Sequence, residues 1–304
     1  MVVLAFGWGL SHSRPTEPRT PRSILWGFAS KFEAVLLLPD KYRAEALAAL
    51  GRAGENAGQL AQALRLTDPA EREGLGFLLA NMPDSDLRTL SARFLAEHVN
   101  LAYQARRSLP LAGGVPDEIF LNDVLPYSVV NERRENWRKE FFALFGPLAA
   151  RSPTIEDAVV DINLGLILHY RLTYRERDNR KRVLSPFESL AAGSVSCGEA
   201  SLLLVAACRS VGIPARLIVL PLWAHVPAGH IWVEVYDRGQ WRHLVAFDVS
   251  RLDRTWMEPH FVALNPANPA QRIYASSFKK TNIHVTYGPS VSFTDITDGY
   301  RAGK

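Results

Sequence analysis

The first third of the chain, from about residue 25 to residue 108, is patterned as a series of helices. Apolar positions recur every three or four residues, the spacing that places them on one helix face. Thr67-Asp68-Pro69 opens one of these helices, because proline suits a first helical turn, and Met82-Pro83 ends it. Asp84 or Ser85 is expected to cap one long helix that follows. The pattern predicts an all-helical support region and shows no candidate chemistry.

The next part of the chain connects this region to a different pattern. Pro110 to Pro116 is rich in glycine and proline, which is typical of a linker. An amphipathic helix is expected over residues 134–148 and another over residues 154–170. Thr154 is suited to cap the second helix, because its hydroxyl can accept a hydrogen bond from the first turn.

From residue 194 onward one helix is followed by short strands. The helix is expected to end at Gly212, with Pro214 just beyond as a stop signal. Its apolar run predicts that it packs across a sheet, with four residues mostly buried: Leu203, Val205, Ala207 and Val211. Strands are expected over the ranges 216–220, 230–236, 241–248 and 282–287. A core helix followed by antiparallel strands predicts an α+β fold.

Composition narrows the class of protein. The chain has 304 residues, of which 47% are hydrophobic and 22% charged, and its net charge is only +4, as in soluble globular proteins. No basic stripe with interleaved aromatic residues appears, so nucleic acid is not an expected partner. No apolar run is long enough to span a membrane. Met1 to Leu10 is apolar without a basic flank; a start within a secretory signal, which would make the protein extracytoplasmic, and a frayed cytoplasmic tail both fit this pattern.

Two cysteines provide candidate chemistry. They cannot build a disulfide framework or a zinc site, and neither a metal nor a cofactor is expected. Ser196 and Glu199 form a capping box, which makes Cys197 the first helical residue. Unpaired N–H groups and the helix dipole favour a thiolate there, so the thiol pKa is expected to fall. Cys208 lies in the apolar interior of the same helix and is expected to be inert.

A thiol nucleophile needs a base, and the base needs a residue to orient it. His230 opens a strand directly after Gly229, so it is the candidate base for Cys197. Asp248 ends the returning strand and is the candidate orienting carboxylate, with Asp253 as the alternative.

The register of this hairpin decides whether His230 and Asp248 meet. If Asp237 pairs with Trp241 across a three-residue loop, His230 lies opposite Asp248. If the pairing is shifted by one residue, Asp248 points to the other face unless a bulge restores the alignment. We expect the first register or a bulged form of the second.

The order of Cys197, Gly229-His230 and Asp248 resembles the transglutaminase-like superfamily, in a bacterial subgroup with an N-terminal helical region. The segments that carry the resemblance are Ser196-Cys197-Gly198-Glu199-Ala200-Ser201, Val211-Gly212-Ile213-Pro214-Ala215-Arg216, Gly229-His230-Ile231-Trp232-Val233-Glu234-Val235 and Trp241 to Asp248. The family usually has Asp-Pro where this chain has Asp248-Val249.

The resemblance implies a papain-like fold and acyl transfer at amide bonds through a cysteine thioester. Cys197 would be the nucleophile, His230 the base and Asp248 the orienting residue. The oxyanion would be held by the Cys197 N–H and a second donor, for which Trp223 and the segment around Ser194 are open candidates. The substrate would be the amide of a peptide or protein, with hydrolysis preferred. Protein cross-linking and a catalytically idle binding module remain alternatives.

The resemblance also suggests how the chain is divided. The expected parts are a flexible or targeting N-terminus (1–24), a helical domain (25–110), a linking segment (111–150), a transglutaminase-like catalytic domain (151–290) and a C-terminal tail (291–304).

Overall fold

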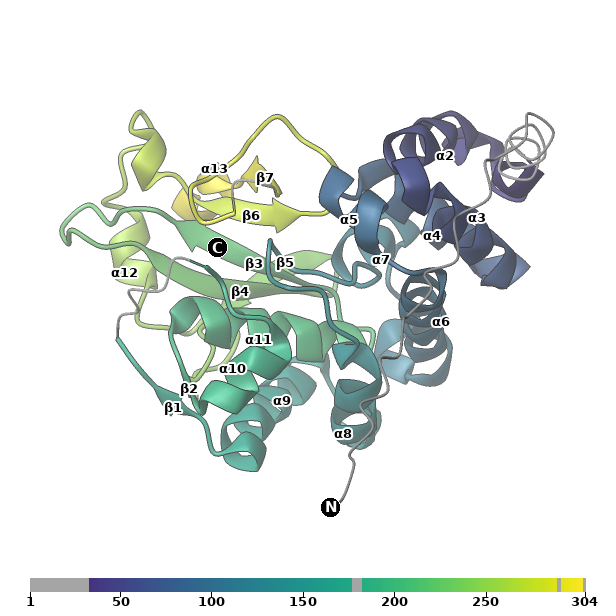
Figure 1. Cartoon of the computed structure of the whole chain (residues 1–304). Helices are drawn as coiled ribbons and strands as arrows, with labels where there is room; N and C mark the ends of the chain where they lie inside the picture. The colour runs from purple at the N-terminus through teal and green to yellow at the C-terminus, as the bar shows by residue number, and fades with distance from the viewer. Residues whose placement is uncertain (1–32, 177–181, 289–290, 303–304) are drawn as a thin grey trace, which may run out of the picture.

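The computed structural model describes residues 33–176, 182–288 and 291–302. The segment expected to be a flexible or targeting N-terminus, 1–24, lies outside the described residues. Figure 1 shows a helical region on one side and a mixed region of helices and sheet on the other. No helix within the described residues is both long enough and apolar enough to cross a membrane.

The helical region has its own apolar core. Its helices are α2 (Asp40–Arg52), α3 (Ala57–Leu66), α4 (Arg72–Asn81), α5 (Asp84–Thr89), α6 (Ala92–Ser108) and α7 (Asp117–Asp123). The expectation of one long helix after Met82-Pro83 is wrong. The backbone becomes extended at Leu90, and the Ser91 side chain then caps a new helix by accepting a bond from the Phe94 N–H at 3.2 Å.

The mixed region is built around one antiparallel sheet of five strands in the order β5-β4-β3-β6-β7. The strands of this sheet are β3 (Ala215–Leu220), β4 (His230–Asp237), β5 (Gln240–Leu244), β6 (Tyr274–Ser277) and β7 (Ser292–Asp295). A separate parallel pair is formed by β1 (Thr173–Tyr174) and β2 (Ser194–Val195). The helices are α8 (Trp137–Arg151), α9 (Ile155–Tyr170), α10 (Pro186–Ala192), α11 (Cys197–Ser210), α12 (Glu258–Phe261) and α13 (Thr297–Arg301). This arrangement confirms the predicted α+β class.

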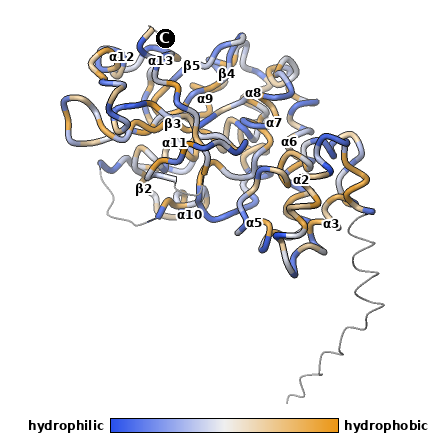
Figure 2. The backbone as a smooth tube through the Cα atoms, turned by 90° about the horizontal axis from the view of Figure 1, so that it is seen from above, coloured by the Kyte–Doolittle hydropathy of each residue, from blue (hydrophilic) through white to orange (hydrophobic). Residues whose placement is uncertain are grey.

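Helix α11 is the central element of this region. It packs against β3 and β4 on one side and against α8 and α9 on the other. The four residues expected to be buried, Leu203, Val205, Ala207 and Val211, have no exposed surface. Figure 2 shows apolar stretches both around α2 and α3 and in the mixed region, and each region has an apolar core of its own.

Strand β4 divides its side chains between the two faces of the sheet, as its alternation predicts. Ile231, Val233 and Val235 face the α11 side. Trp232 lies on the other face, in a third apolar cluster that includes Phe261 of α12. The sheet is therefore covered on both faces.

The hairpin register differs from the first expectation. Asp237 pairs with Gln240 and Tyr236 with Trp241, so the loop has two residues, not three. Arg238 (φ 51°) and Gly239 (φ 86°) both have left-handed backbone angles, as a type I′ turn requires. Strand β5 ends at Leu244, before the expected end at Asp248, and Phe247 turns the chain with a φ of 68°.

The last part of the sheet was also predicted wrongly. Residues 282–287, expected as a strand, contribute only an isolated bridge between Ile283 and Phe293. The strands that complete the sheet are β6 and β7, and β7 falls in the stretch expected to be a C-terminal tail.

Candidate active site

Cys197 is the first residue of α11, as the capping box predicts. The Ser196 N–H donates to the Glu199 carboxylate at 2.9 Å, and Arg175 also binds that carboxylate. The thiol is partly buried, and the N–H groups of Ile231 and Gly198 point at its sulfur. Burial nevertheless raises the pKa of the Cys197 thiol above its ordinary value, because the N–H groups offset only part of the desolvation. The expected lowering of this pKa is therefore wrong in direction.

Two tyrosines close around the thiol. Tyr174, on β1, shares a hydrogen bond with Cys197, and half of its side chain is exposed. The hydroxyl of Tyr287 occupies the space beside Gly198: a Cβ atom on that glycine would lie 2.3 Å from it. The absence of a side chain at Gly198 thus makes room for the Tyr287 ring beside the thiol. Sequence reasoning missed both tyrosines, since neither belongs to a recognisable motif.

His230 opens β4 because Gly229 lets two chain segments come together. A Cβ atom on Gly229 would lie 2.4 Å from the Leu220 carbonyl oxygen and 2.5 Å from that of Pro221. This close approach fixes where the strand begins. It places His230 and Cys197 on the wall of the same pocket, which has a volume of about 480 Å³.

The imidazole of His230 lies among aromatic rings. Its centroid is 6.1 Å from that of Trp232 and 5.1 Å from that of Trp256. Burial lowers the pKa of His230 to about 4, so the ring is neutral at pH 7. His230 also lines a second pocket, of about 310 Å³, together with Trp223 and His260. His230 thus lines both the pocket of the thiol and an aromatic pocket.

The described structure brings Cys197 and His230 to one pocket but records no hydrogen bond between them. The Nε2 atom of His230 is buried and has no hydrogen-bond partner among the described residues. Asp248 likewise forms no recorded bond with the ring. Instead its turn is held from α9, where the Asn163 side chain donates to the Asp248 carbonyl at 2.9 Å and accepts from the Phe247 N–H at 3.0 Å.

The other acidic candidates serve different partners. Asp253, the alternative orienting residue, lies 3.0 Å from Nδ1 of His243 and binds Arg242 at 2.8 Å. His243 also contacts Glu258 at 2.7 Å, which makes it a buried, paired histidine of the far face. Glu234 is bound to Arg216 at 2.6 Å. Of the described acids, none is bonded to His230.

This arrangement can support nucleophilic chemistry after a local adjustment. A thiol at a helix N-terminus and a neutral imidazole share one accessible pocket, and catalytic hydrogen bonds often form only once a substrate is bound. Because burial raises the pKa of the Cys197 thiol and lowers that of His230, any attack by this thiol would have to include transfer of its proton.

One part of the chain matches a known protein family. Residues 147–246 match the family model described as the transglutaminase-like superfamily. No curated protein sequence matches the chain.

Two solved structures resemble the chain weakly. A cysteine protease candidate from Cytophaga hutchinsonii aligns at 18% identity with a TM-score of 0.35, over 64% of this chain and 61% of the other. LapG of Legionella pneumophila aligns at 12% identity with a TM-score of 0.29, over 50% of this chain and 75% of the other. The chain therefore spans less than two thirds of the length of the Cytophaga protein.

The matched range holds α9, α11, β3, β4 and β5, and with them both Cys197 and His230. From residue 147 to residue 246, this chain carries a domain of the transglutaminase-like superfamily.

Proposed function

We propose that this chain is a cysteine hydrolase that cleaves amide bonds of peptides or proteins through a thioester on Cys197. The observation that carries the proposal is the shared pocket of Cys197 and His230 at the start of α11, within the range that matches the family. Cys208, by contrast, has no exposed surface in the interior of the same helix.

The proposed reaction begins with a neutral thiol. His230 takes the thiol proton while the sulfur attacks the amide carbonyl, and it then gives that proton to the leaving amine. Water attacks the resulting thioester, with the imidazole again accepting a proton, and the acid and the free thiol are released. The backbone N–H groups at the helix start would stabilise the oxyanion of each tetrahedral intermediate.

The proposal requires the imidazole to turn toward the sulfur when a substrate binds. The ring lies against Trp232 and Trp256, and its buried Nε2 atom has no hydrogen-bond partner in the part of the chain that the structure describes. An unpaired buried nitrogen is costly, which favours such a movement. Asp248 is proposed to hold the turned ring, from a loop that Asn163 already fixes.

The test is turnover of a panel of fluorogenic peptide amides. Cys197→Ala and His230→Asn should each abolish cleavage, and Asp248→Asn should reduce it by roughly 10² to 10⁴-fold, as for other orienting residues. Cys208→Ala is the matched control and should retain activity. Full activity of Cys197→Ala would contradict the proposal.

The missing hydrogen bond between thiol and imidazole favours one other function, a catalytically idle binding module. The two functions differ in one outcome. An idle module would bind peptides but leave every amide in the panel intact, and neither Cys197→Ala nor His230→Asn would change the products. Cross-linking would appear as attachment of an added primary amine to the peptides of the panel, which mass spectrometry of the products detects.

A further inference from the structure

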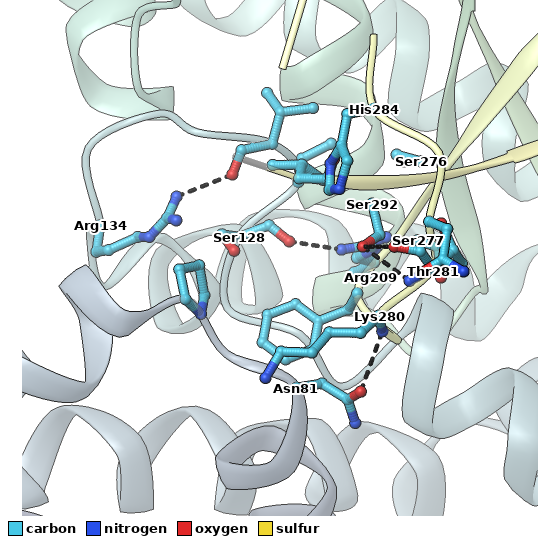
Figure 3. Close-up of a pocket in the computed structure, with 16 residues that line it drawn as sticks. Asn81, Ser128, Arg134, Arg209, Ser276, Ser277, Lys280, Thr281, His284 and Ser292 are labelled. Carbon is cyan, nitrogen blue, oxygen red and sulfur yellow. Dashed lines mark hydrogen bonds between the residues drawn. The ribbon is translucent and has the colours of Figure 1, made fainter. Parts of the chain in front are cut away.

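A pocket of about 340 Å³ lies where the helical region meets the sheet, and neither Cys197 nor His230 lines it (Figure 3). Its walls come from distant parts of the chain: the end of α4, the loop before α8, the end of α11, and β6 with the segment that follows. Three lining side chains are positively charged: Arg134, Arg209 and Lys280. The lining also includes five residues with hydroxyl groups: Ser128, Ser276, Ser277, Thr281 and Ser292. No carboxylate is found among the described residues that line it.

Arg209 is the unusual member of this set, because its charge is buried and no described carboxylate pairs with it. It is only 2% exposed, and its Nε and Nη1 atoms donate to the carbonyl oxygens of Ala215 and Ser128, each at 2.9 Å (Figure 3 shows the second bond). No described carboxylate lies within 4.0 Å of the guanidinium, and Nη2 has no recorded hydrogen bond. A buried, uncompensated cation is strongly unfavourable.

The acids that act on Arg209 do not neutralise its charge. Asp123 and Glu132 act on Arg209 only from a distance. The Glu132 carboxylate is already held by the N–H groups of Val129 and Val130, each at 2.8 Å. Arg138 adds a second buried positive charge nearby. It is fully buried, donates to the Arg209 carbonyl and is not paired with any described carboxylate.

The other two cations differ in how far they are neutralised. Arg134 is paired with Asp86 at 2.9 Å, so its charge is largely compensated. Lys280 is exposed, and its ammonium donates only to the Ala80 carbonyl, at 2.9 Å. Positive charge therefore remains at two positions, the buried Arg209 and the exposed Lys280.

We propose that this pocket binds a small oxyanion, a carboxylate or a phosphate group. Arg209 would supply the buried charge that recognises it, and Lys280 a second charge from the exposed side. The hydroxyls of Ser128 and Ser276, which donate no hydrogen bond to a described residue, would serve as neutral donors. A bound anion would connect α4, the end of α11 and the segment after β6, and so join the two regions of the molecule. This inference does not depend on the proposed function.

The experiment titrates the full chain with inorganic phosphate and, separately, with succinate, while chloride keeps the ionic strength constant. Calorimetry should show saturable binding of at least one of them, and the thermal unfolding midpoint should rise with its concentration. The stronger of the two identifies the ligand as phosphate or carboxylate. Absence of saturable binding for both anions would overturn the proposal.

Matched variants locate the site. Lys280→Ala should weaken the binding about tenfold, because it removes one charge-assisted bond. Lys279→Ala is the control: its side chain lines a different pocket, and binding should not change. Ser128→Asp should abolish binding by placing a carboxylate beside Arg209. Equal effects of the two lysine variants, or undiminished binding by Ser128→Asp, would show that the anion binds elsewhere.

Discussion

At the scale of single residues, burial keeps both members of the proposed pair neutral. It raises the pKa of the Cys197 thiol and lowers that of His230 to about 4. The helix start supplies N–H groups to the sulfur, but they do not outweigh the loss of solvent. A helix-start position was visible in the sequence, whereas the burial that reverses its effect was not.

This protonation state predicts how Cys197 reacts with iodoacetamide. Because the thiolate is the reactive form and the thiol pKa lies above its ordinary value of 9.0, the alkylation rate should still be rising at pH 9. The measurement is the rate at which Cys197 is modified, followed by peptide mass, against free cysteine as a reference. A plateau of high reactivity near neutral pH would instead reveal a preformed thiolate–imidazolium pair.

At the scale of elements, α11 was the most predictable part of the site. Its start follows from the capping box of Ser196 and Glu199, and its end from Gly212 and the proline beyond. Local chemistry fixes both ends, so one sequence is enough to find them.

The hairpin after it was predicted less well, because distant contacts decide its details. The two-residue turn needs a left-handed Arg238, an uncommon conformation for that residue type. Beyond Leu244 the strand ends in a turn that is held by Asn163, from another helix. The position of Asp248 relative to His230 follows from these contacts, so no alternation rule could give it.

The capping box offers a test of how α11 presents the thiol. Glu199→Ala removes the bond to the Ser196 N–H and leaves Arg175 without that carboxylate, so it should lower the free energy of unfolding by about 1 kcal/mol or more. It should also change the alkylation rate of Cys197, since the first turn of the helix loosens.

The matched control is Glu188→Ala. Glu188 forms the same capping box with Ser185 at the start of α10. Its loss should cost a similar free energy, measured by urea unfolding, but leave the alkylation rate unchanged. Identical rates in both variants would mean that the cap of α11 does not govern the thiol.

At the scale of the whole molecule, the buried His98 and the partly buried His230 couple the free energy of unfolding to pH. Burial lowers the pKa of His98 to about 3 and that of His230 to about 4, while both should titrate near 6.5 in the unfolded chain. Between these values the unfolded state binds more protons than the folded one. The part of the unfolding free energy that comes from these two histidines is therefore fully present above about pH 6.5 and is lost as the pH falls.

Between its folded-state pKa and about pH 6.5, each histidine should contribute a slope of up to about 1.4 kcal/mol per pH unit. Asp123 acts in the opposite direction, because burial raises its pKa to about 6 and its proton favours the folded state as the pH falls. Urea unfolding of the wild type and of His98→Gln between pH 5 and pH 7 isolates one contribution. The variant should lose less stability on acidification; parallel curves would refute the assignment.

The division of the chain into a helical domain (25–110) and a catalytic domain (151–290) stays a prediction, because it rests on the change in the hydrophobic pattern alone. The pockets were not foreseen. Each is lined by segments that are far apart in the chain, as Arg134, Arg209 and Lys280 illustrate.

The proposed reaction passes an acyl group through the sulfur of Cys197. The most direct measurement is mass spectrometry of the protein after rapid mixing with a cleavable peptide ester or amide and quenching in acid, which preserves thioesters. We expect a mass increase equal to the acyl part, mapped to Cys197 in the wild type and in Cys208→Ala, and absent from Cys197→Ala. Turnover without any adduct on Cys197, or an adduct on Cys208, would contradict it.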